Sequence, residues 1–521
     1  MYQYSLIETL INKFNLESDI NKISIIDFLK INKNIDKYYE TLENYSNPTE
    51  EEQYIINMYT SKQAKIKEII SQNFYFNIFL DIFMILNNPF NVDDFKFDIF
   101  YDNLKLLNDV HLILIKNYEK IINSDLYKFY NIDLINKWID TIEQKPMKKD
   151  EYYKLSKLEN DDKDIKWKKY NEIWQVYNAE CIKFKTYLYK LRDFYQTKNI
   201  PIAGCYNISK ELYEHCVEAN TGIKLDILKL EKWALRKLDK LVSKMKSYIK
   251  KINPNIDEKL NVIQMLNQIN NSQRFKTKNE FIDHYKLKMK KYEDYFVKEK
   301  NFPHFTKCNL VTFDDENLGG AYYGDNNFYL NSSRINEEFK YTTETLVLHE
   351  SIPGHHTQVH CTKYINMDNN LLYQYFFDIS NGFVEGWGLF SEKLGHDQSE
   401  WDIVGQIEYD MLRTLRVIVD IRIHYKGYTV DEIYNYMKNY LSISESKLKT
   451  EIYRYVCMPG QAISYKVGSQ IYKTILKKNN IKYYLDPKAI QIYKEIIKFG
   501  PMPLKYLVKK YNINVDDVFK V

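Results

Sequence analysis

Residues 346–358 read Leu346-Val347-Leu348-His349-Glu350-Ser351-Ile352-Pro353-Gly354-His355-His356-Thr357-Gln358. A His-Glu pair ends an apolar run, and two more histidines follow a Pro-Gly step. Neither packing in a core nor exposure on a surface explains this clustering of histidines with a glutamate. We therefore interpret the stretch as half of a zinc site.

A proline interrupts the usual zinc motif. Catalytic zinc takes three protein ligands and keeps a fourth position for water, whose pKa falls to about 7. In the helical motif His-Glu-x-x-His, two histidines four residues apart share one face and the Glu is the general base. Here the second histidine position holds Pro353. Proline has no N–H for the carbonyl of His349, and Gly354 accepts unusual backbone angles, so we expect the helix to break at 352–354.

The break decides which histidine pairs with His349. In an unbroken helix His355 would lie about 120° away around the axis, and His356 would stand roughly 10 Å along it. Two nitrogens that each lie about 2 Å from one zinc ion cannot be that far apart. A turn that absorbs two residues would bring His355 into place, so we expect His355 to be the ligand. His356 is the alternative; otherwise it faces the substrate or supports the ligands. A helix end that happens to carry histidines is the competing explanation.

The third ligand is expected to be Glu385. It lies in the mostly apolar run 383–390, where burying an unpaired carboxylate is costly and a cation would remove that cost. Two histidines and a glutamate are the ligand set of thermolysin-type zinc; a glutamate at a helix N-terminus is the alternative. Glu392, two turns later, either supports a ligating histidine or is an exposed charge.

Glu350 is the expected general base. It directly follows a ligand histidine, so its carboxylate would face the zinc-activated water, take its proton and return it to the leaving amine. A plain surface charge is the alternative.

Composition excludes several classes of function. The 521 residues can form one large domain or two or three ordinary ones, and 74 basic and 70 acidic side chains nearly cancel. This balance argues against nucleic acid or a membrane as partner. The N-terminal residues lack a signal-peptide pattern, and the apolar run 74–86 is too short to span a membrane and is expected to be a buried helix. The six cysteines show no C-x-x-C spacing, which suits a cytoplasmic protein without disulfides.

The chain changes character near residue 200. Before it, apolar residues recur at three- and four-residue spacing, and after it a helical run at 209–219 ends at Gly222. We expect an N-terminal helical portion, 1–200, and a zinc-binding catalytic portion, 201–521, joined as one continuous unit. Helices are expected over 223–300 with a break at Pro254.

A small β element is expected just before the zinc site. Two strands, 309–313 and 327–331, flank a turn-rich segment. An edge strand there would hold a substrate backbone by strand addition. A hairpin that only covers the core is the alternative.

Several motifs together resemble a known family. They are His349-Glu-x-x-Pro-Gly-His-His-x-Gln358, Glu385-Gly-Trp-Gly388, Gly320-Ala-Tyr-Tyr323, Arg413-x-x-Arg416-x-x-x-Asp420-x-x-x-His424, Arg454-Tyr455, and Pro459-Gly-Gln-Ala462 followed by Tyr465-Lys466-x-Gly468. They resemble the "domain of unknown function" family of zinc peptidases with the His-Glu-x-x-Pro-Gly-His-His signature, which is distantly similar to the gluzincins. The resemblance covers roughly residues 200–521. It implies a mainly α, multi-helix gluzincin-like fold with a deep cleft, peptidase activity and one Zn²⁺ ion.

The same resemblance implies roles for other residues. By its similarity in layout to gluzincins, Tyr465 is a candidate donor for the developing oxyanion, as are Tyr322 and Tyr323, which would also bind substrate. Apart from the resemblance, the bidentate fork of a guanidinium makes Arg416 and Arg454 candidates to clamp a substrate C-terminal carboxylate.

The arginines have a structural alternative. Arg413, Arg416, Asp420 and His424 fall at helical spacings, so an ion-pair ladder within one helix would explain them equally well.

We expect a zinc-dependent metallopeptidase that acts on short or unfolded peptides, with Glu350 as base. A zinc hydrolase of a non-peptide amide or ester is one alternative. A catalytically idle helical binding protein that keeps the metal for structure is the other, and the presence of Glu350 argues against it.

Overall fold

The computed structural model describes residues 160–197, 210–303, 306–314, 320–324, 326–333, 335–365 and 381–520, together with residues 149 and 153. Contacts divide the chain into two compact units, 1–202 and 203–521. Of the first unit the structure describes mainly the long helix α7 (Asn160–Thr197). The apolar run 74–86 and most of the expected N-terminal helical portion lie outside the described residues.

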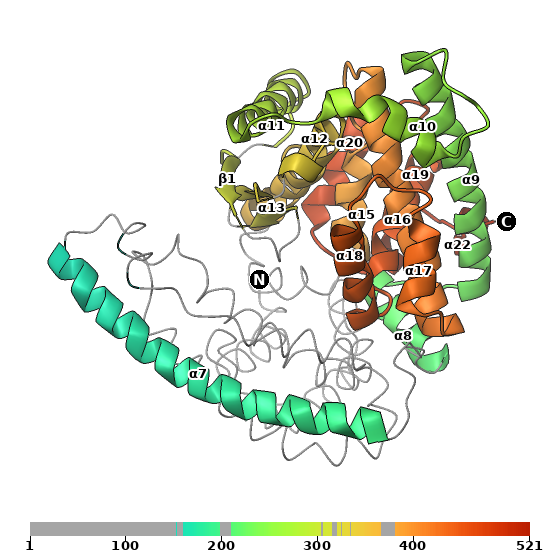
Figure 1. The fold of residues 1–521 in the computed structure, drawn as a ribbon. Coiled ribbons are helices and arrows are strands. Elements are labelled where there is room, and N and C mark those ends of the chain that lie inside the picture. The colour runs from blue at the N-terminus through green and yellow to red at the C-terminus, as the bar shows by residue number, and fades with distance from the viewer. Residues whose placement is uncertain are drawn as a thin grey trace, which may run out of the picture. The chain divides into compact units, whose positions relative to one another are not determined.

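The second unit is mainly α-helical, as the sequence predicts (Figure 1). Its α-helices are α8 (Lys210–Thr221), α9 (Ile227–Ile252), α10 (Val262–Ile269), α11 (Lys278–Glu293), α12 (Lys340–Glu350), α13 (His355–Ile365), α15 (Asn381–Ser391), α16 (Glu400–Lys426), α17 (Val430–Met437), α18 (Glu445–Cys457), α19 (Gln461–Lys478), α20 (Pro487–Phe499), α21 (Leu504–Lys510) and α22 (Val515–Val518). Pro254 lies in the break between α9 and α10, as expected. None of the helices described is both long and apolar enough to cross a membrane.

The second unit packs around α16, which contacts α9, α12, α18 and α19 (Figure 1). A capping box of Ser399 and Asp402 begins this helix, and Gly427 ends it in the left-handed conformation at φ 75°. Between these caps most side chains of α16 are buried, charged ones included. Buried charges need partners, so the charged residues of α16 must pair with other elements.

A three-stranded sheet precedes α12. It contains β1 (Asn309–Phe313), β2 (Ala321–Gly324) and β3 (Asn327–Asn331), in the order β1-β3-β2. The two expected strands are confirmed, but they pair in parallel, and the segment expected to form only turns holds the edge strand β2, antiparallel to β3. The sheet is therefore not a simple hairpin.

α15 and α19 approach each other through glycines. A side-chain atom on Gly386 would overlap the backbone of Gly468, and one on Gly468 would overlap the carbonyl oxygen of Gly382. Residues with a Cβ could not approach this closely without a shift of the backbone. The contact brings the turn of α15 that carries Glu385 next to the first turns of α19, which carry Tyr465.

Candidate metal centre

The stretch that carries the histidines is split between two helices, as the sequence predicts. α12 ends at Glu350, α13 begins at His355, and residues 351–354 form the turn between them. A side-chain atom on Gly354 would overlap the carbonyl oxygen of His349, so the chain folds back tightly onto the end of α12. The turn brings the ring centres of His349 and His355 to 4.8 Å from each other.

Helix α15 supports this turn through two hydrogen bonds. The Ser391 hydroxyl donates to the carbonyl oxygen of Leu348 at 2.7 Å, and the Trp387 indole N–H donates to that of Pro353 at 2.9 Å. A broken helix leaves such carbonyls without their intrahelical partners, and buried carbonyls need replacements. α15 therefore fixes the geometry of the break.

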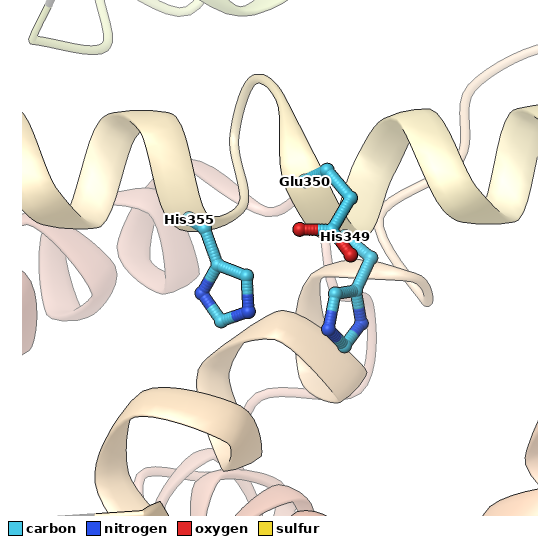
Figure 2. Close-up of side chains that lie close together, drawn as sticks. All are labelled: His349, Glu350 and His355. Atoms are coloured by element: carbon cyan, nitrogen blue, oxygen red, sulfur yellow. The ribbon is translucent and has the colours of Figure 1, made fainter. Parts of the chain in front are cut away.

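Glu385 of α15 lies beside both imidazoles. Its Oε2 is 3.6 Å from Nε2 of His349 and 3.5 Å from Nε2 of His355. Ligand atoms arranged tetrahedrally at about 2 Å from one zinc ion are about 3.3 Å apart, so these three atoms match a shared ion. His349, His355 and Glu350 are all buried and also offer ligand atoms within 4.8 Å of one another. Figure 2 shows the two imidazoles on the same side of the broken helix, with the Glu350 carboxylate beside them.

Gly388 allows both imidazoles to lie close against α15. A Cβ on Gly388, one turn after Glu385, would lie 2.7 Å from Nε2 of His349 and 2.9 Å from Nε2 of His355. Two imidazole nitrogens and one carboxylate are also the donor types that zinc accepts. The residues present therefore fit a divalent zinc ion.

The electrostatics of the three donors point the same way. Burial alone would raise the pKa of the Glu385 carboxyl, but the two imidazoles hold that pKa well below its usual range. Burial alone would lower the pKa of His349, but Glu385 and Glu392 raise it to about 9. In the absence of a cation, the carboxylates thus draw a proton to His349, and a bound cation would displace that proton.

The other ring nitrogen of each histidine is anchored. Nδ1 of His349 donates to Oε1 of Glu392 at 2.9 Å, and Nδ1 of His355 donates to Oε1 of Gln358 at 3.2 Å. These bonds anchor both rings through Nδ1, so that Nε2 of each neutral ring would carry the lone pair for an ion shared with Glu385. Arg413 lies 3.4 Å from the same Glu392 oxygen. Glu392 therefore supports a histidine and is not an exposed charge.

We expect Glu392→Gln to weaken zinc binding by roughly tenfold, because a neutral amide orients His349 but no longer raises its basicity. Competition with a chromophoric chelator measures this affinity. Glu400→Gln on the exposed start of α16 is the control, and an equal loss in both variants would contradict the role given to Glu392.

His356 points away from the metal donors. Its Nε2 donates to the carbonyl oxygen of Thr306 at 2.8 Å, and its Nδ1 accepts from the Tyr323 hydroxyl at 3.2 Å. His356 is only 2% exposed, and its contact with Tyr323 of the cavity leaves the expected supporting role as a prediction. The first residue of α13, and not the second, faces the end of α12.

A cavity of about 430 Å³ opens beside the metal donors, so a cleft is present as expected. The candidate residues Tyr322, Tyr323 and Tyr465 all line it. Tyr322 is 48% exposed and stacks on Tyr329. The Tyr465 ring lies 6.4 Å from that of His349, between centres.

Arg416 and Arg454 also line the cavity, and both bind a carboxylate that the sequence analysis missed. Nη2 of Arg416 donates to Oε2 of Glu451 at 2.8 Å, and Nη2 of Arg454 lies 3.3 Å from the same atom. The Tyr455 hydroxyl donates to it as well. The spacing of Glu451, Arg454 and Tyr455 on one helix face was the available signal.

The alternative of an ion-pair ladder within α16 does not describe the hydrogen bonds that its charged residues make. Asp420 accepts from the Tyr213 hydroxyl of α8 at 2.6 Å, and Nε2 of His424 donates to the carbonyl oxygen of Tyr455 in α18. Arg416 pairs with α18 as well. Each of these residues of α16 thus binds a neighbouring element.

Two solved structures have a similar fold. The putative lipoprotein from Colwellia psychrerythraea matches with a TM-score of 0.67 at 14% identity, covering 96% of this chain and 93% of that one. The putative lipoprotein of unknown function from Shewanella oneidensis matches with a TM-score of 0.68 at 15% identity, covering 96% and 98%. At these identities the similarity shows the fold alone. No curated protein matches the chain significantly.

A family model matches residues 135–510, and its description names no activity. The match begins earlier than residue 200, where the resemblance was expected to start, so the family pattern extends into the first unit. The match covers well over half of the sequence. The chain therefore belongs to the family described as "Bacterial protein of unknown function (DUF885)".

Proposed function

We propose that this protein is a zinc-dependent peptidase of gluzincin-like design. The observation that carries the proposal is the meeting of Glu385 Oε2 with Nε2 of His349 and of His355, at 3.6 and 3.5 Å. Three donors around one point are the ligand number of catalytic zinc, which keeps one position open. When bound there, zinc would supply a Lewis acid and lower the pKa of a coordinated water.

The positions of Glu350 and Tyr465 support the proposal. Glu350 follows His349 at the end of α12, and its carboxylate lines the cavity beside the metal donors. It accepts the proton of the attacking water and passes it to the leaving amine. Burial, and then the negative charge of Glu385, raise the pKa of Tyr465, so its hydroxyl keeps its proton and can donate to the oxyanion.

The edge strand favours a peptide over other amides. β2 borders the cavity, and β3 pairs with one of its edges. The Gly320 carbonyl oxygen accepts from Asn331, which makes these two residues a hydrogen-bonded pair of the ladder. The next residue, Ala321, therefore directs its N–H and C=O away from β3. An extended substrate backbone would bond to this outer edge by strand addition.

Metal depletion and reconstitution test the function. We expect the purified protein to hold one zinc ion per chain, to lose hydrolysis of a short-peptide library on chelation, and to regain it with zinc. Metal analysis and mass spectrometry of the library measure both. The same protein is offered a panel of acyl amides and esters.

The outcomes separate the candidate functions. Turnover of the acyl panel without turnover of peptides would replace the peptidase by a hydrolase of other amides or esters. Full zinc occupancy with no turnover of either set would favour an idle binding protein. Absence of zinc binding would end the proposal.

A further inference from the structure

One wall of the cavity carries more positive than negative charge. Arg413 and Arg416 of α16 and Arg454 of α18 line it. Their carboxylate partners are Glu392 and Glu451. Three guanidinium groups thus face two carboxylates, and one of these carboxylates is also bonded to a histidine of the metal site. We call these three arginines the arginine wall.

The other basic residue of the cavity is already balanced. Lys447 forms an ion pair with Glu338 at 2.5 Å. Burial of Lys447 would lower its pKa, but the charge of Glu338 raises it strongly, so the pair is ionised. Among the arginines and lysines that line the cavity, those of the arginine wall are therefore the group with fewer carboxylate partners than positive charges.

The arginine wall retains hydrogen-bond donors for a ligand. A guanidinium carries five N–H groups. Arg416 uses two of them, toward Tyr455 and Glu451, and Nε and Nη1 of Arg413 have no acceptor among the described residues although the side chain is nearly buried. Buried donors without acceptors cost free energy, and a carboxylate offers a matching pair of oxygens.

The distance from the arginine wall to the metal donors corresponds to a few residues of an extended peptide. The Arg416 guanidinium carbon is 4.7 Å from the centre of the Tyr465 ring, and the His349 ring centre is 6.4 Å from it, so the two are at most about 11 Å apart. An extended peptide advances about 3.5 Å per residue. A carboxylate held by Arg416 would therefore place a carbonyl near the metal one or two residues earlier in the chain.

We propose that the arginine wall binds the free C-terminal carboxylate of the substrate, so that the enzyme removes one or two residues from the C-termini of peptides. This inference rests on the peptidase function proposed above. A chain end fits better than a passing chain, because Arg413 and Arg416 are each more than nine-tenths buried. The cavity of about 430 Å³ also lies in the range that encloses small ligands.

Three matched peptides test the inference on the zinc-loaded protein. The first ends in a free carboxylic acid, and the second has the same sequence with a C-terminal amide. The third also ends in an amide but carries a glutamate as its last residue, so that its only carboxylate near the end is on a side chain. We expect kcat/KM for the free acid to exceed that for the amide by at least about tenfold, as for a charged hydrogen bond lost. Mass spectrometry should place the cut one or two residues from the end. Equal rates for acid and amide, internal cleavage, or full recovery with the glutamate amide would overturn the proposal.

Arginine variants assign the effect to the wall. We expect Arg454→Gln to raise KM for the free-acid peptide by roughly tenfold and to bring the acid-to-amide ratio toward one. Arg454 has a side chain that is 30% exposed, so this variant should fold, and Arg416→Lys provides a second test. Arg422→Lys is the matched control: this residue lies on the same helix, pairs with Glu231 and does not line the cavity. If Arg454→Gln and Arg416→Lys both kept the wild-type ratio of kcat/KM between the free-acid and amide peptides, the arginine wall would not be the carboxylate site.

A binding measurement separates this inference from the peptidase proposal. Calorimetry on zinc-loaded Glu350→Gln protein compares the Kd of the free-acid and amide peptides without turnover. If the wild-type protein cleaves no peptide, the peptidase proposal fails. In that case, carboxylate binding by the arginine wall is still supported if the free-acid peptide binds at least about tenfold more tightly than the amide peptide. It is contradicted if the two peptides bind equally.

Discussion

Replacing Glu350 with Gln should lower kcat on a short peptide by roughly a thousandfold while zinc content stays at one ion per chain. The amide has the size of the carboxylate but cannot accept the water's proton, and general acid–base catalysis contributes about 10²- to 10⁴-fold. Glu350 is buried beside the metal donors, so few other groups can replace it. Steady-state kinetics together with metal analysis of the same sample measure both quantities.

Two outcomes would contradict this role for Glu350. Unchanged kcat in a zinc-loaded Glu350→Gln protein would mean that another group takes the proton. Loss of zinc in that variant, with zinc retained in Glu385→Gln, would make Glu350 the ligand in place of Glu385. Glu495→Gln, on the exposed face of α20, is the control for the substitution itself.

Gly388→Ala should reduce zinc affinity by at least about a hundredfold, more than a change at an orienting residue causes. The added methyl would sit 2.7 Å from Nε2 of His349 and 2.9 Å from Nε2 of His355, so both rings would have to move. Zinc ligands tolerate displacements of only about 0.2 Å. Zinc stoichiometry after dialysis against a weak chelator measures the loss.

Two controls separate an effect on the metal site from a general loss of stability. Gly324→Ala is the matched control, because a Cβ there meets its nearest neighbour at an ordinary 3.7 Å. Thermal unfolding of both metal-free variants tests whether Gly388→Ala acts through the site, since overpacking alone costs about 1–3 kcal/mol. Normal zinc occupancy in Gly388→Ala would show that the rings do not converge above this glycine.

The break in the helix between His349 and His355 was predictable because its cause is local. Pro353 and Gly354 dictate the backbone at their own positions, whatever packs around them. Glu385 was predictable for a different reason, since a carboxylate in an apolar run needs a partner. In both cases the sequence itself carries the physical constraint.

Other features depend on elements that are distant in the sequence. Strand β2 has glycines on both sides, so its local signal is that of a turn, and only pairing with β3 makes it a strand. Glu451 lies in a helix rich in charges and gains its importance when α18 packs on α16. The Pro-Gly break favours His355 over His356, but the direction of each ring also depends on how α15 holds the turn at 351–354, which the sequence does not show.

The charged residues of α16 show the same limit. Spacing along one helix favours partners on that helix, and the sequence offers no view of competing helices. Because α16 is buried on most of its surface, its neighbours supply the partners instead. A charged series on a central helix is thus better interpreted as a set of links between elements.

Glu385 and Gly388 lie one turn apart on α15, and Glu392 directly follows its last residue. This one segment thus supplies the proposed third ligand, the space that both imidazoles need and the anchor of His349. Its seam with α19 consists of main chain against main chain at Gly386 and Gly468, with no side chain that could yield. A larger residue at Gly386 or Gly468 would therefore have to shift α15 as a whole relative to α19. Drift in metal affinity among natural relatives should accordingly track residue size along the α15–α19 seam, at positions that never touch the ion.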